Sequence, residues 1–600
     1  MTKKPYTRGE IPEHLKWNLE LLYPSADDWE HDFSNIDVLL NEFQKYRGRI
    51  GESPSALERA YMAGDKLERL LEKLSAYARH KSDEDTRNCK NLERVERIAS
   101  RIAEIDGETA WFEPELLEIP DDKITCFINS PQLYFYKRSI IELLEKKPHT
   151  LTNKEERILG LASDIMEVPL EVFSLLNDAD LIFPSIADGK GGRVQLTHGN
   201  YKNLLENKDR AVRRSAFNTV HKTYRKFRNT FSALLDSTVK INVFESKLRG
   251  FSSVLQAKLF EEKIPESVFT TCIESVKSHL PVAGEYYSLR KKMLGLDKIE
   301  MYDLACPLLD TPERIYSWEE ACSIVCESLK PIGNEYVMTV TNGLKNERWV
   351  DALESIGKRS GAYSGGSYDS LPYILMNFSG TLDDVFTLAH ELGHSMHSFF
   401  TNRAMKYHYS DYSIFIAEIA SMVNELLLYE YLLEKTNNQE EMISLKLHLC
   451  DEIRTTVYRQ AMFSEFEKII YEKRENNLPL TSEGLCELYA EINQIYYPGV
   501  KKNSGIEIEW ARIPHFHYGF YVFKYVTGFV SAFDIVSSLL NEGEHVKDKY
   551  IAFLSAGSSL DTMELLEKVG VNIGSSEIYI RFFENFSKNL RDIEKELKTN

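Results

Sequence analysis

Two histidines four residues apart, with a glutamate directly after the first, are the residues of this chain best suited to chemistry. They are His390, Glu391 and His394, in the order His-Glu-Leu-Gly-His. On an α-helix, residues i and i+4 share one face, so both imidazoles can bind one metal ion. Glu391 then lies beside the metal, where its carboxylate can take a proton from water. The pattern predicts a hydrolytic site with one Zn²⁺ per chain.

The residues around this motif predict the helix that would carry it. Thr381 and Asp384 have the spacing of a capping box, with Asp in place of Glu. Apolar residues then recur at three- and four-residue steps, at Leu382, Val385, Phe386, Ala389, Leu392, Met396 and Phe399. Because these flank the histidines, we expect the helix to be embedded, where a metal removes the cost of burying unpaired polar groups.

A zinc site of this kind needs a third protein ligand and one open position. Glu418 lies in an apolar segment, residues 415–425, that reads as a second helix. Glutamate is rarely buried alone, so Glu418 is either the third ligand or half of a buried ion pair. His397 is the rival ligand, but a third ligand from the same short helix would splay the geometry. We therefore expect Glu418 to bind the metal and Glu425, two turns on, to orient a ligand histidine.

The segment before the motif helix departs from the helical pattern. Residues 361–368 are short of helix formers, and residues 372–378 read as a strand that leads into the helix. An exposed strand edge near Tyr373–Phe378 would let an extended peptide add as one more strand. The alternative is a purely structural hairpin. The residues expected to contact substrate here are Tyr363, Gly365, Gly366 and Tyr373.

A late segment rich in histidine and tyrosine, residues 512–525, is the remaining constellation. Histidine and tyrosine donors near a metal can hydrogen-bond the oxyanion of a tetrahedral intermediate. The alternative is an aromatic core helix. The sequence leaves several candidates open, with Tyr525 also expected to contact substrate: His515, His517, Tyr518, Tyr521 and Tyr525.

Several segments together resemble the oligoendopeptidase F branch of the thimet oligopeptidase-like (M3) metallopeptidases. The resemblance covers most of the chain from about residue 110 onward. It rests on residues 361–368, 372–378, 390–394 and 415–418, with further matches at Phe183-Pro184 and the following hairpin, at 302–304 with Pro307-Leu308, and at 512–516.

The resemblance implies a zinc endopeptidase of short oligopeptides. It implies a mostly α fold, a large helical zincin-type metallopeptidase with a deep substrate channel and a small β hairpin or sheet beside the zinc helix. In such relatives a histidine and tyrosines from the region of 512–525 contact the oxyanion. Phe523 stands where relatives often have tyrosine, so no hydroxyl donor is expected there.

Helical periodicity dominates the rest of the chain, interrupted by a hairpin signal at residues 185–197. With the resemblance, this predicts two regions. Residues 1–195 form an N-terminal helical region of the oligopeptidase F N-terminal type, and residues 196–600 form the M3-type catalytic region.

Composition limits the partners of the protein. The chain has 600 residues, 43% of them hydrophobic, and a formal net charge of −19. These values describe an ordinary globular protein and argue against nucleic acid and anionic membranes as partners. A channel that favours basic peptides would fit the charge, but a total charge does not locate a field. A homo-oligomer is left open.

The eight cysteines show neither zinc-knuckle nor disulfide-framework spacing, which suits a reducing cytoplasm. Residues 1–10 lack the apolar core of a signal peptide. The most hydrophobic late stretch, residues 520–540, contains Lys524 and Asp534, and we expect it to fall short of a membrane span.

Two other functions fit parts of the pattern. A helical metallocarboxypeptidase would need a cation for the substrate C-terminus, and Arg359 is the candidate. A non-enzymatic helical peptide-binding protein is the second alternative. It is disfavoured because the full water-activating set of residues is present.

Overall fold

The computed structural model describes residues 6–309 and 314–598. Helices hold 72% of the residues and strands 3%, which confirms the predicted mostly helical fold with small sheets. Residues 1–5, part of the segment judged to lack a signal peptide, lie outside the described residues. The chain forms two compact units, each assembled from three stretches of sequence: 1–150, 313–431 and 535–570 in the first, and 151–312, 432–534 and 571–600 in the second. The division into residues 1–195 and 196–600 stays a prediction about sequence regions.

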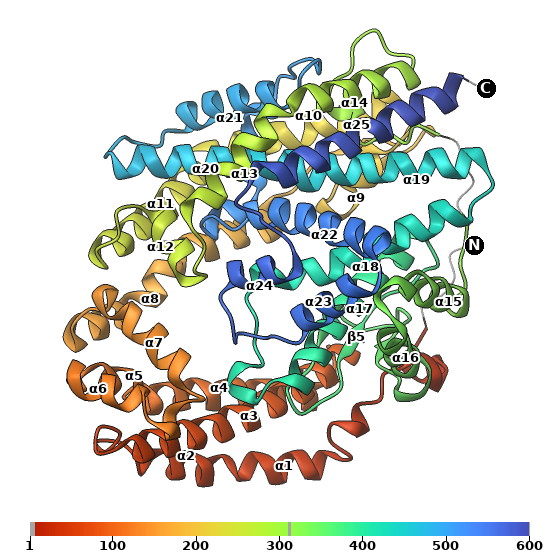
Figure 1. Ribbon diagram of the computed structural model, residues 1–600. Helices are drawn as coiled ribbons and strands as arrows, with labels where there is room; N and C mark the ends of the chain where they lie inside the picture. The colour runs from red at the N-terminus through yellow and green to blue at the C-terminus, as the bar shows by residue number, and fades with distance from the viewer. Residues whose placement is uncertain (1–5, 310–313, 599–600) are drawn as a thin grey trace. The chain divides into compact units, whose positions relative to one another are not determined.

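The first unit contains the motif helix and a small sheet. Its long helix α3 packs against α2 and α4 (Figure 1). Helix α18 begins in this unit and ends in the second. The helices of the first unit are α1 (Ala26–Ser34), α2 (Ile36–Gln44), α3 (Pro54–Glu84), α4 (Cys89–Thr109), α5 (Phe112–Leu117), α6 (Asp121–Ile128), α7 (Lys137–Lys146), α15 (Trp318–Ser328), α16 (Asn334–Asn342), α17 (Leu382–Ala404), α18 (Ile414–Lys435), α23 (Glu544–Leu554) and α24 (Thr562–Val569).

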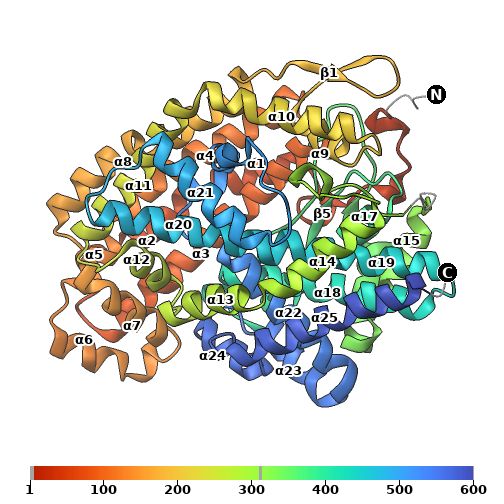
Figure 2. The same ribbon diagram turned by 90° about the horizontal axis from the view of Figure 1, so that it is seen from above.

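The second unit contains the remaining helices and a hairpin. Helices α19 and α25 pack together (Figure 2). The hairpin pairs β1 (Ser185–Ala187) antiparallel with β2 (Arg193–Gln195), as its turn sequence predicts. The helices are α8 (Asn153–Ser174), α9 (His198–Leu205), α10 (Arg210–Lys226), α11 (Arg228–Leu248), α12 (Val254–Glu261), α13 (Glu266–Ser278), α14 (Leu280–Met293), α19 (Gln439–Glu452), α20 (Arg459–Glu475), α21 (Ser482–Tyr496), α22 (Phe523–Glu542), which ends in the first unit, and α25 (Ser576–Lys598).

The sheet of the first unit has three strands, in the order β3-β5-β4. The central strand β5 (Tyr373–Leu375) pairs in parallel with β3 (Val350–Asp351) and antiparallel with β4 (Tyr363–Gly365). The expectation that Tyr373–Phe378 forms an exposed edge is therefore wrong. Both edges of β5 are paired, one with β3 and one with β4. The sequence did not predict these two partners, because each is only two or three residues long. The edge strands are β3 and β4, and backbone bonds from Asn18 to Arg348 and from Ala352 to Leu15 flank β3.

Helices α3 and α4 supply much of the core beneath this sheet. Tyr373 and Leu375 of β5 pack in one apolar cluster with Leu74 and Tyr77 of α3 and Ile98 of α4. The Tyr373 side chain is fully buried, and its hydroxyl donates to the Asn18 carbonyl at 3.1 Å. Tyr373 therefore anchors the sheet and leaves no side-chain surface for substrate.

Helix α22 is, within the described residues, the one helix that is long and apolar enough to cross a membrane by length and composition. The expectation that this stretch falls short of a span was too strict on that criterion. Of its most apolar window, 61% is buried inside the protein. A core helix of a soluble protein meets the same criterion.

Candidate active site with a metal-binding centre

Helix α17 begins as its sequence predicts. The Asp384 backbone N–H donates to the Thr381 hydroxyl at 3.2 Å, and the Thr381 backbone N–H donates to the Asp384 carboxylate at 3.0 Å. This reciprocal cap satisfies donors that the helix leaves unpaired, and the acidic first turn suits the positive end of the helix dipole. The helix start is thereby fixed, and with it the face that carries His390 and His394.

Helix α18 crosses α17 very closely at the motif. A Cβ atom on Gly393 would lie 2.5 Å from the Ala420 carbonyl oxygen and 2.5 Å from the Ser421 Cα, so only glycine allows this approach. The buried Asn424 fastens the contact by donating from its side-chain amide to the Ala389 carbonyl at 3.0 Å. The close crossing brings α18, and with it Glu418, to the two histidines.

Three side chains converge where the helices meet. His390 Nε2 and His394 Nε2 are 3.2 Å apart, and Glu418 Oε2 lies 3.5 and 3.7 Å from them. Three ligands of a tetrahedral zinc ion, with bonds of about 2.0–2.1 Å, are separated by about 3.3 Å. Two imidazoles and a carboxylate are also a zinc donor set. The described residues contain this one group with the spacing of a metal site.

Each histidine ring is held by a contact from α18. His390 Nδ1 lies 2.5 Å from Glu425 Oε1, and the His394 ring hydrogen-bonds the Ala417 carbonyl. Burial lowers the pKa of His394 to about 3, helped by the charge of His390, so its ring is neutral. Burial also lowers the pKa of His390, but the Glu425 hydrogen bond and nearby carboxylates outweigh it and raise that pKa to about 9. Glu425 thus has the position of the ring-orienting residue that the sequence suggests.

Glu391 lies in the wall of the same site. Its side chain is buried, and the Ser364 backbone amide of β4 hydrogen-bonds its carboxyl group. Burial raises the pKa of Glu391 to about 7 against the lowering charge of His390, with Glu418 adding to the rise. A carboxyl with a pKa near neutrality is suited to accept and return a proton.

His397, the rival third ligand, is outside this group of donors. It is completely buried and stacks on Tyr412, with ring centroids 3.7 Å apart. Within the described part of the chain neither of its ring nitrogens has a hydrogen-bond partner. Burial lowers its pKa to about 3, so the ring is a neutral packing element.

Strand β4 connects the metal group to the expected substrate residues. The Ser364 hydroxyl lies 2.8 Å from the Ser395 hydroxyl of α17, which ties the edge strand to the motif helix. Gly365 and Gly366 follow directly along the edge. The Tyr363 side chain points away from it, because its hydroxyl donates to Asp83 at 2.7 Å. The edge therefore offers substrate mainly the backbone of β4.

Comparison with known proteins places this arrangement in a family. The family model described as "Peptidase family M3" matches residues 203–584, and the model described as "Oligopeptidase F" matches residues 115–183. The chain belongs to peptidase family M3, in its oligoendopeptidase F branch.

Full-length relatives agree with this assignment. The chain is 39% identical to Oligopeptidase PepF of Bacillus subtilis, over 98% of this chain and 88% of that protein. It is 38% identical to an Oligoendopeptidase F homolog of Lactococcus lactis, over 98% of both. In structure it is similar to a putative peptidase from Chlamydophila abortus, with a TM-score of 0.90, 32% identity and coverage of 98% and 100%. Oligoendopeptidase-F from Enterococcus faecium gives a TM-score of 0.75, 33% identity and coverage of 96% and 99%.

Membership of the oligoendopeptidase F branch makes this chain a metalloendopeptidase that acts on oligopeptides. The non-enzymatic alternative is thereby excluded. Arg359, the candidate for a carboxypeptidase, is paired with Asp83 at 3.4 Å.

The late histidine and tyrosine residues of this M3 peptidase lie in the second unit. The ring of His515 lies 6.2 Å from that of Tyr521 and 6.1 Å from that of Tyr525, with Tyr518 at 5.9 Å. We call these four residues the His/Tyr cluster. Tyr518 is 49% exposed, so the cluster opens to solvent.

His517 lies outside the His/Tyr cluster. Its Nδ1 is 2.8 Å from the Thr238 hydroxyl, it packs on Phe173, and burial lowers its pKa to about 4. Phe523 is fully buried against Phe269. The structure thus separates His515 from His517, a choice that the sequence left open, while the part that any of these residues plays in the reaction stays a prediction.

Sequence reasoning missed three residues that build the site. Gly393 was visible inside the motif, and a glycine within a strongly apolar helix is itself a signal of close packing. Asn424 and Ser364 gave no such signal, because their contacts exist only once α18 and β4 have docked on α17.

Proposed function

We propose that this metallopeptidase is zinc-dependent and hydrolyses internal bonds of short, unfolded oligopeptides, with His390, His394 and Glu418 as ligands and Glu391 as general base. The observation that carries the proposal is the triangle of donor atoms at 3.2, 3.5 and 3.7 Å, with a buried carboxyl beside it.

The residues divide the chemistry among them. When bound, zinc supplies a Lewis acid that polarises the scissile carbonyl and lowers the pKa of a water molecule. The Glu391 carboxylate takes the proton of the attacking water and later gives it to the leaving amine. Glu425 holds the His390 imidazole in the tautomer that leaves Nε2 free to bind metal, and the hydrogen bond to Ala417 orients the His394 ring. The β4 backbone aligns an extended peptide through main-chain hydrogen bonds.

We infer that the His/Tyr cluster donates hydrogen bonds to the oxyanion of the tetrahedral intermediate. His515 with Tyr521 and Tyr525 supplies the donors, and Tyr518 is the solvent-exposed member of the cluster. We assign this role to His515 and not to His517, because His517 contacts Thr238 and Phe173 in the core.

The test uses the purified full-length protein and an internally quenched peptide of about ten residues. We expect cleavage of an internal bond, loss of activity on dialysis against a chelator, and recovery with one equivalent of zinc. Mass spectrometry of the native protein should find one zinc per chain. Peptides with amidated C-termini should be cut as fast as free ones. Activity that survives complete metal removal, or that needs a free terminus, would contradict the proposal.

We also propose a cytoplasmic location. All eight cysteines are free, four of them buried, and burial raises the pKa of the thiols of Cys272 and Cys450. Unpaired thiols in such number suit a reducing compartment. Fractionation of the source cells should find the activity with soluble cytoplasmic markers, and recovery from an oxidising compartment would contradict this proposal.

A further inference from the structure

A cavity of about 690 Å³ lies in the first unit beside α17. Its wall is formed by α3, by the segment that follows β4, by the second half of α17 and by residues 407–412. Gly365 and Gly366 of the β4 edge and Ser398 of α17 belong to this wall. The backbone of Gly365 and Gly366 belongs to the proposed substrate edge, but the side chains of the wall have no part in the functions assigned above.

Two elements place the cavity close to the metal group. Ser398 lies one helical turn after His394, about 6 Å along α17. Gly365 directly follows Ser364, whose amide bonds the Glu391 carboxyl. An extended peptide advances about 3.3 Å per residue, so a substrate on the β4 edge would present a side chain to the cavity one or two residues from the cleaved bond.

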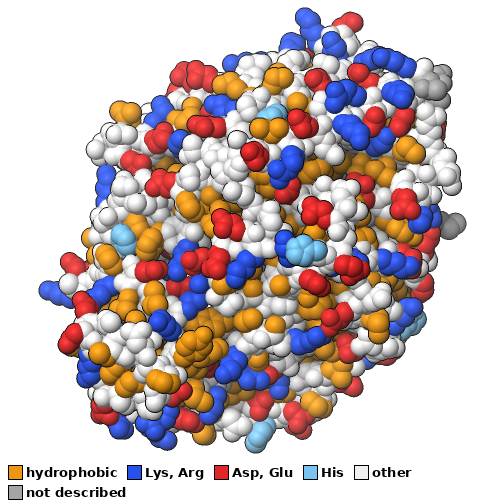
Figure 3. Space-filling model, viewed as in Figure 1, with side chains coloured by type: hydrophobic (Ala, Val, Ile, Leu, Met, Phe, Trp, Pro, Cys, Tyr) orange, Lys and Arg blue, Asp and Glu red, His pale blue; other side chains and the backbone are white. Residues whose placement is uncertain are grey.

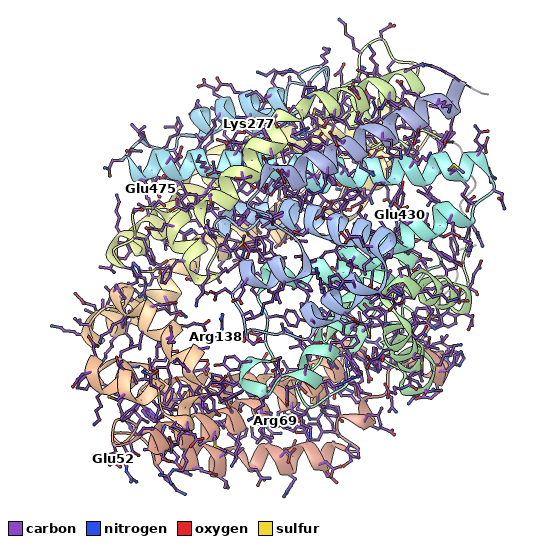
Figure 4. The ribbon with its side chains drawn as sticks, in the orientation of Figure 1. Glu52, Arg69, Arg138, Lys277, Glu430 and Glu475 are labelled. Atoms are coloured by element: carbon purple, nitrogen blue, oxygen red, sulfur yellow. The ribbon has the colours of Figure 1, made fainter. Side chains whose placement is uncertain are left out.

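The wall carries an excess of negative charge. Glu68 and Glu72 of α3 and Asp411 line it, and among the described residues none of the three forms an ion pair. The basic residues of the wall, Arg403 and His408, are already engaged, and His408 Nδ1 lies 2.9 Å from Asp65. Arg403 pairs with Glu335, and Arg69, which Figure 4 labels on α3, pairs with Asp369. Figure 3 shows charges of both signs interspersed on the viewed surface, whereas this cavity has an excess of one sign.

Polar atoms in the wall also lack partners. Ser367 is only 5% exposed, yet its hydroxyl has no hydrogen-bond partner in the described structure, and the same holds for Oε2 of Glu72. Partial burial raises the pKa of Glu72, the Tyr368 backbone amide opposes the rise, and Asp369 and Asp411 add to it. Like charges one turn apart on a helix repel, so a cation in the cavity would relieve a cost that the free protein carries.

We propose that this cavity is a subsite for a positively charged group of the peptide substrate, with Glu68, Glu72 and Asp411 as its counter-charges and Ser367 as a neutral acceptor. The proposal rests on the proposed peptidase function. Two sources share the required chemistry, the side chain of lysine or arginine and the α-ammonium group of a peptide whose N-terminus lies near the cleaved bond. The β4 backbone would then bind peptides without regard to sequence, and the cavity would favour those that carry a positive charge at the right position.

The experiment measures kcat/KM for quenched peptides that share one cleaved bond, confirmed by mass spectrometry of the products. Each of the three positions on either side carries lysine, norleucine or glutamate in turn, with the N-terminus free or acetylated. We expect lysine to exceed norleucine at least 10-fold at one position and glutamate to fall below norleucine there. A preference that acetylation removes would assign the cavity to the α-ammonium group, and one that survives would assign it to the side chain.

Matched variants connect the preference to the cavity. In the Glu68→Gln/Glu72→Gln double variant the lysine preference should fall below about 3-fold, while the norleucine peptide is cut within about 3-fold of wild type. Asp411→Asn should reduce the preference in part. Glu58→Gln, on the same helix but outside the wall, should leave it unchanged.

Three results would overturn the proposal: no position with a lysine preference, a preference that survives in the double variant, or an equal loss on all peptides. Failure of the proposed function itself would look different, because wild type would then show no chelator-sensitive cleavage of the norleucine peptide.

Discussion

Glu391 is buried and contacts the backbone of strand β4, and its pKa, which burial raises to about 7, suits proton transfer. Glu391→Gln keeps the side-chain shape and removes the proton acceptor. We expect the variant to bind zinc like wild type and to lose at least about 10³-fold in kcat. Metal analysis and peptide kinetics on one preparation check this. Near-normal turnover of the zinc-loaded variant would remove Glu391 from the role of base.

Substitution of the different residues around the proposed metal site should weaken zinc binding to different degrees. Glu418→Ala removes the proposed third ligand and should abolish stoichiometric zinc. Glu425→Ala should weaken binding by only about 10- to 100-fold, because the proposed role of Glu425 is to orient His390. His397→Ala should leave zinc content intact, since His397 is packed on Tyr412. Zinc titration with a competing chelator separates the three. Loss of metal from the His397 variant with retention in the Glu418 variant would reverse the assignment.

A buried acid outside the metal group makes stability depend on pH. Glu467 of α20 is fully buried and accepts a hydrogen bond from the Phe520 N–H at 2.8 Å, where Phe520 has a left-handed φ of 54°. Burial raises its pKa to about 8 from 4.5. Between these values the folded state holds a proton that the unfolded state has lost, so stability falls as pH rises.

Glu467→Gln keeps the acceptor for Phe520 and cannot ionise. Relative to wild type, its free energy of unfolding should therefore increase from pH 5 to pH 8, by at most about 1.4 kcal/mol per pH unit. Denaturant titrations of both proteins across this pH range measure the difference between their free energies of unfolding. The contributions of titratable groups that the two proteins share cancel in this difference. If the free energies of unfolding of the two proteins change in parallel with pH, Glu467 is ionised in the folded protein and the prediction is wrong.

At the scale of elements, the site depends on how closely α18 approaches α17. In Gly393→Ala the new Cβ would lie 2.5 Å from backbone atoms of α18, which cannot rotate away as a side chain can. We expect a loss of about 1–3 kcal/mol in stability and at least 10-fold weaker zinc binding, because Glu418 moves with α18.

The matched control for Gly393→Ala is a helical glycine with open space around it. Gly107 of α4 meets nothing within 4 Å, so Gly107→Ala should raise stability by up to about 1 kcal/mol and leave zinc binding unchanged. Equal effects of the two substitutions would mean that the crossing of α17 and α18 adapts to a methyl group.

At the scale of the whole molecule, chemistry-bearing residues fall in both compact units. The metal donors and β4 belong to the first, and the His/Tyr cluster belongs to the second. A substrate that adds to the β4 edge must be extended, which a folded protein cannot provide without unfolding. We expect short peptides to be cut at least 10²-fold faster than a native globular protein. Comparable rates on a native protein and on its reduced, unfolded form would contradict this.

The sequence by itself determined what depends on local spacing. The capping pair Thr381 and Asp384, the i and i+4 histidines of α17 and the amphipathic helices all follow from contacts within a few residues. The sequence also predicted Glu418 as a candidate ligand, because a carboxylate in an apolar helix is stable only with a partner. Resemblance to the family rested on several such local segments in order.

Only the tertiary structure decided which strand is the edge, which histidine joins the His/Tyr cluster and why position 393 must be glycine. Tyr373 became central because β3 and β4 paired on either side of it, and His517 left the cluster because Thr238 and Phe173 enclosed it. The negative cavity is likewise assembled from α3, the segment after β4, α17 and residues 407–412. Partners far apart in sequence fix these features, and no local spacing encodes such contacts.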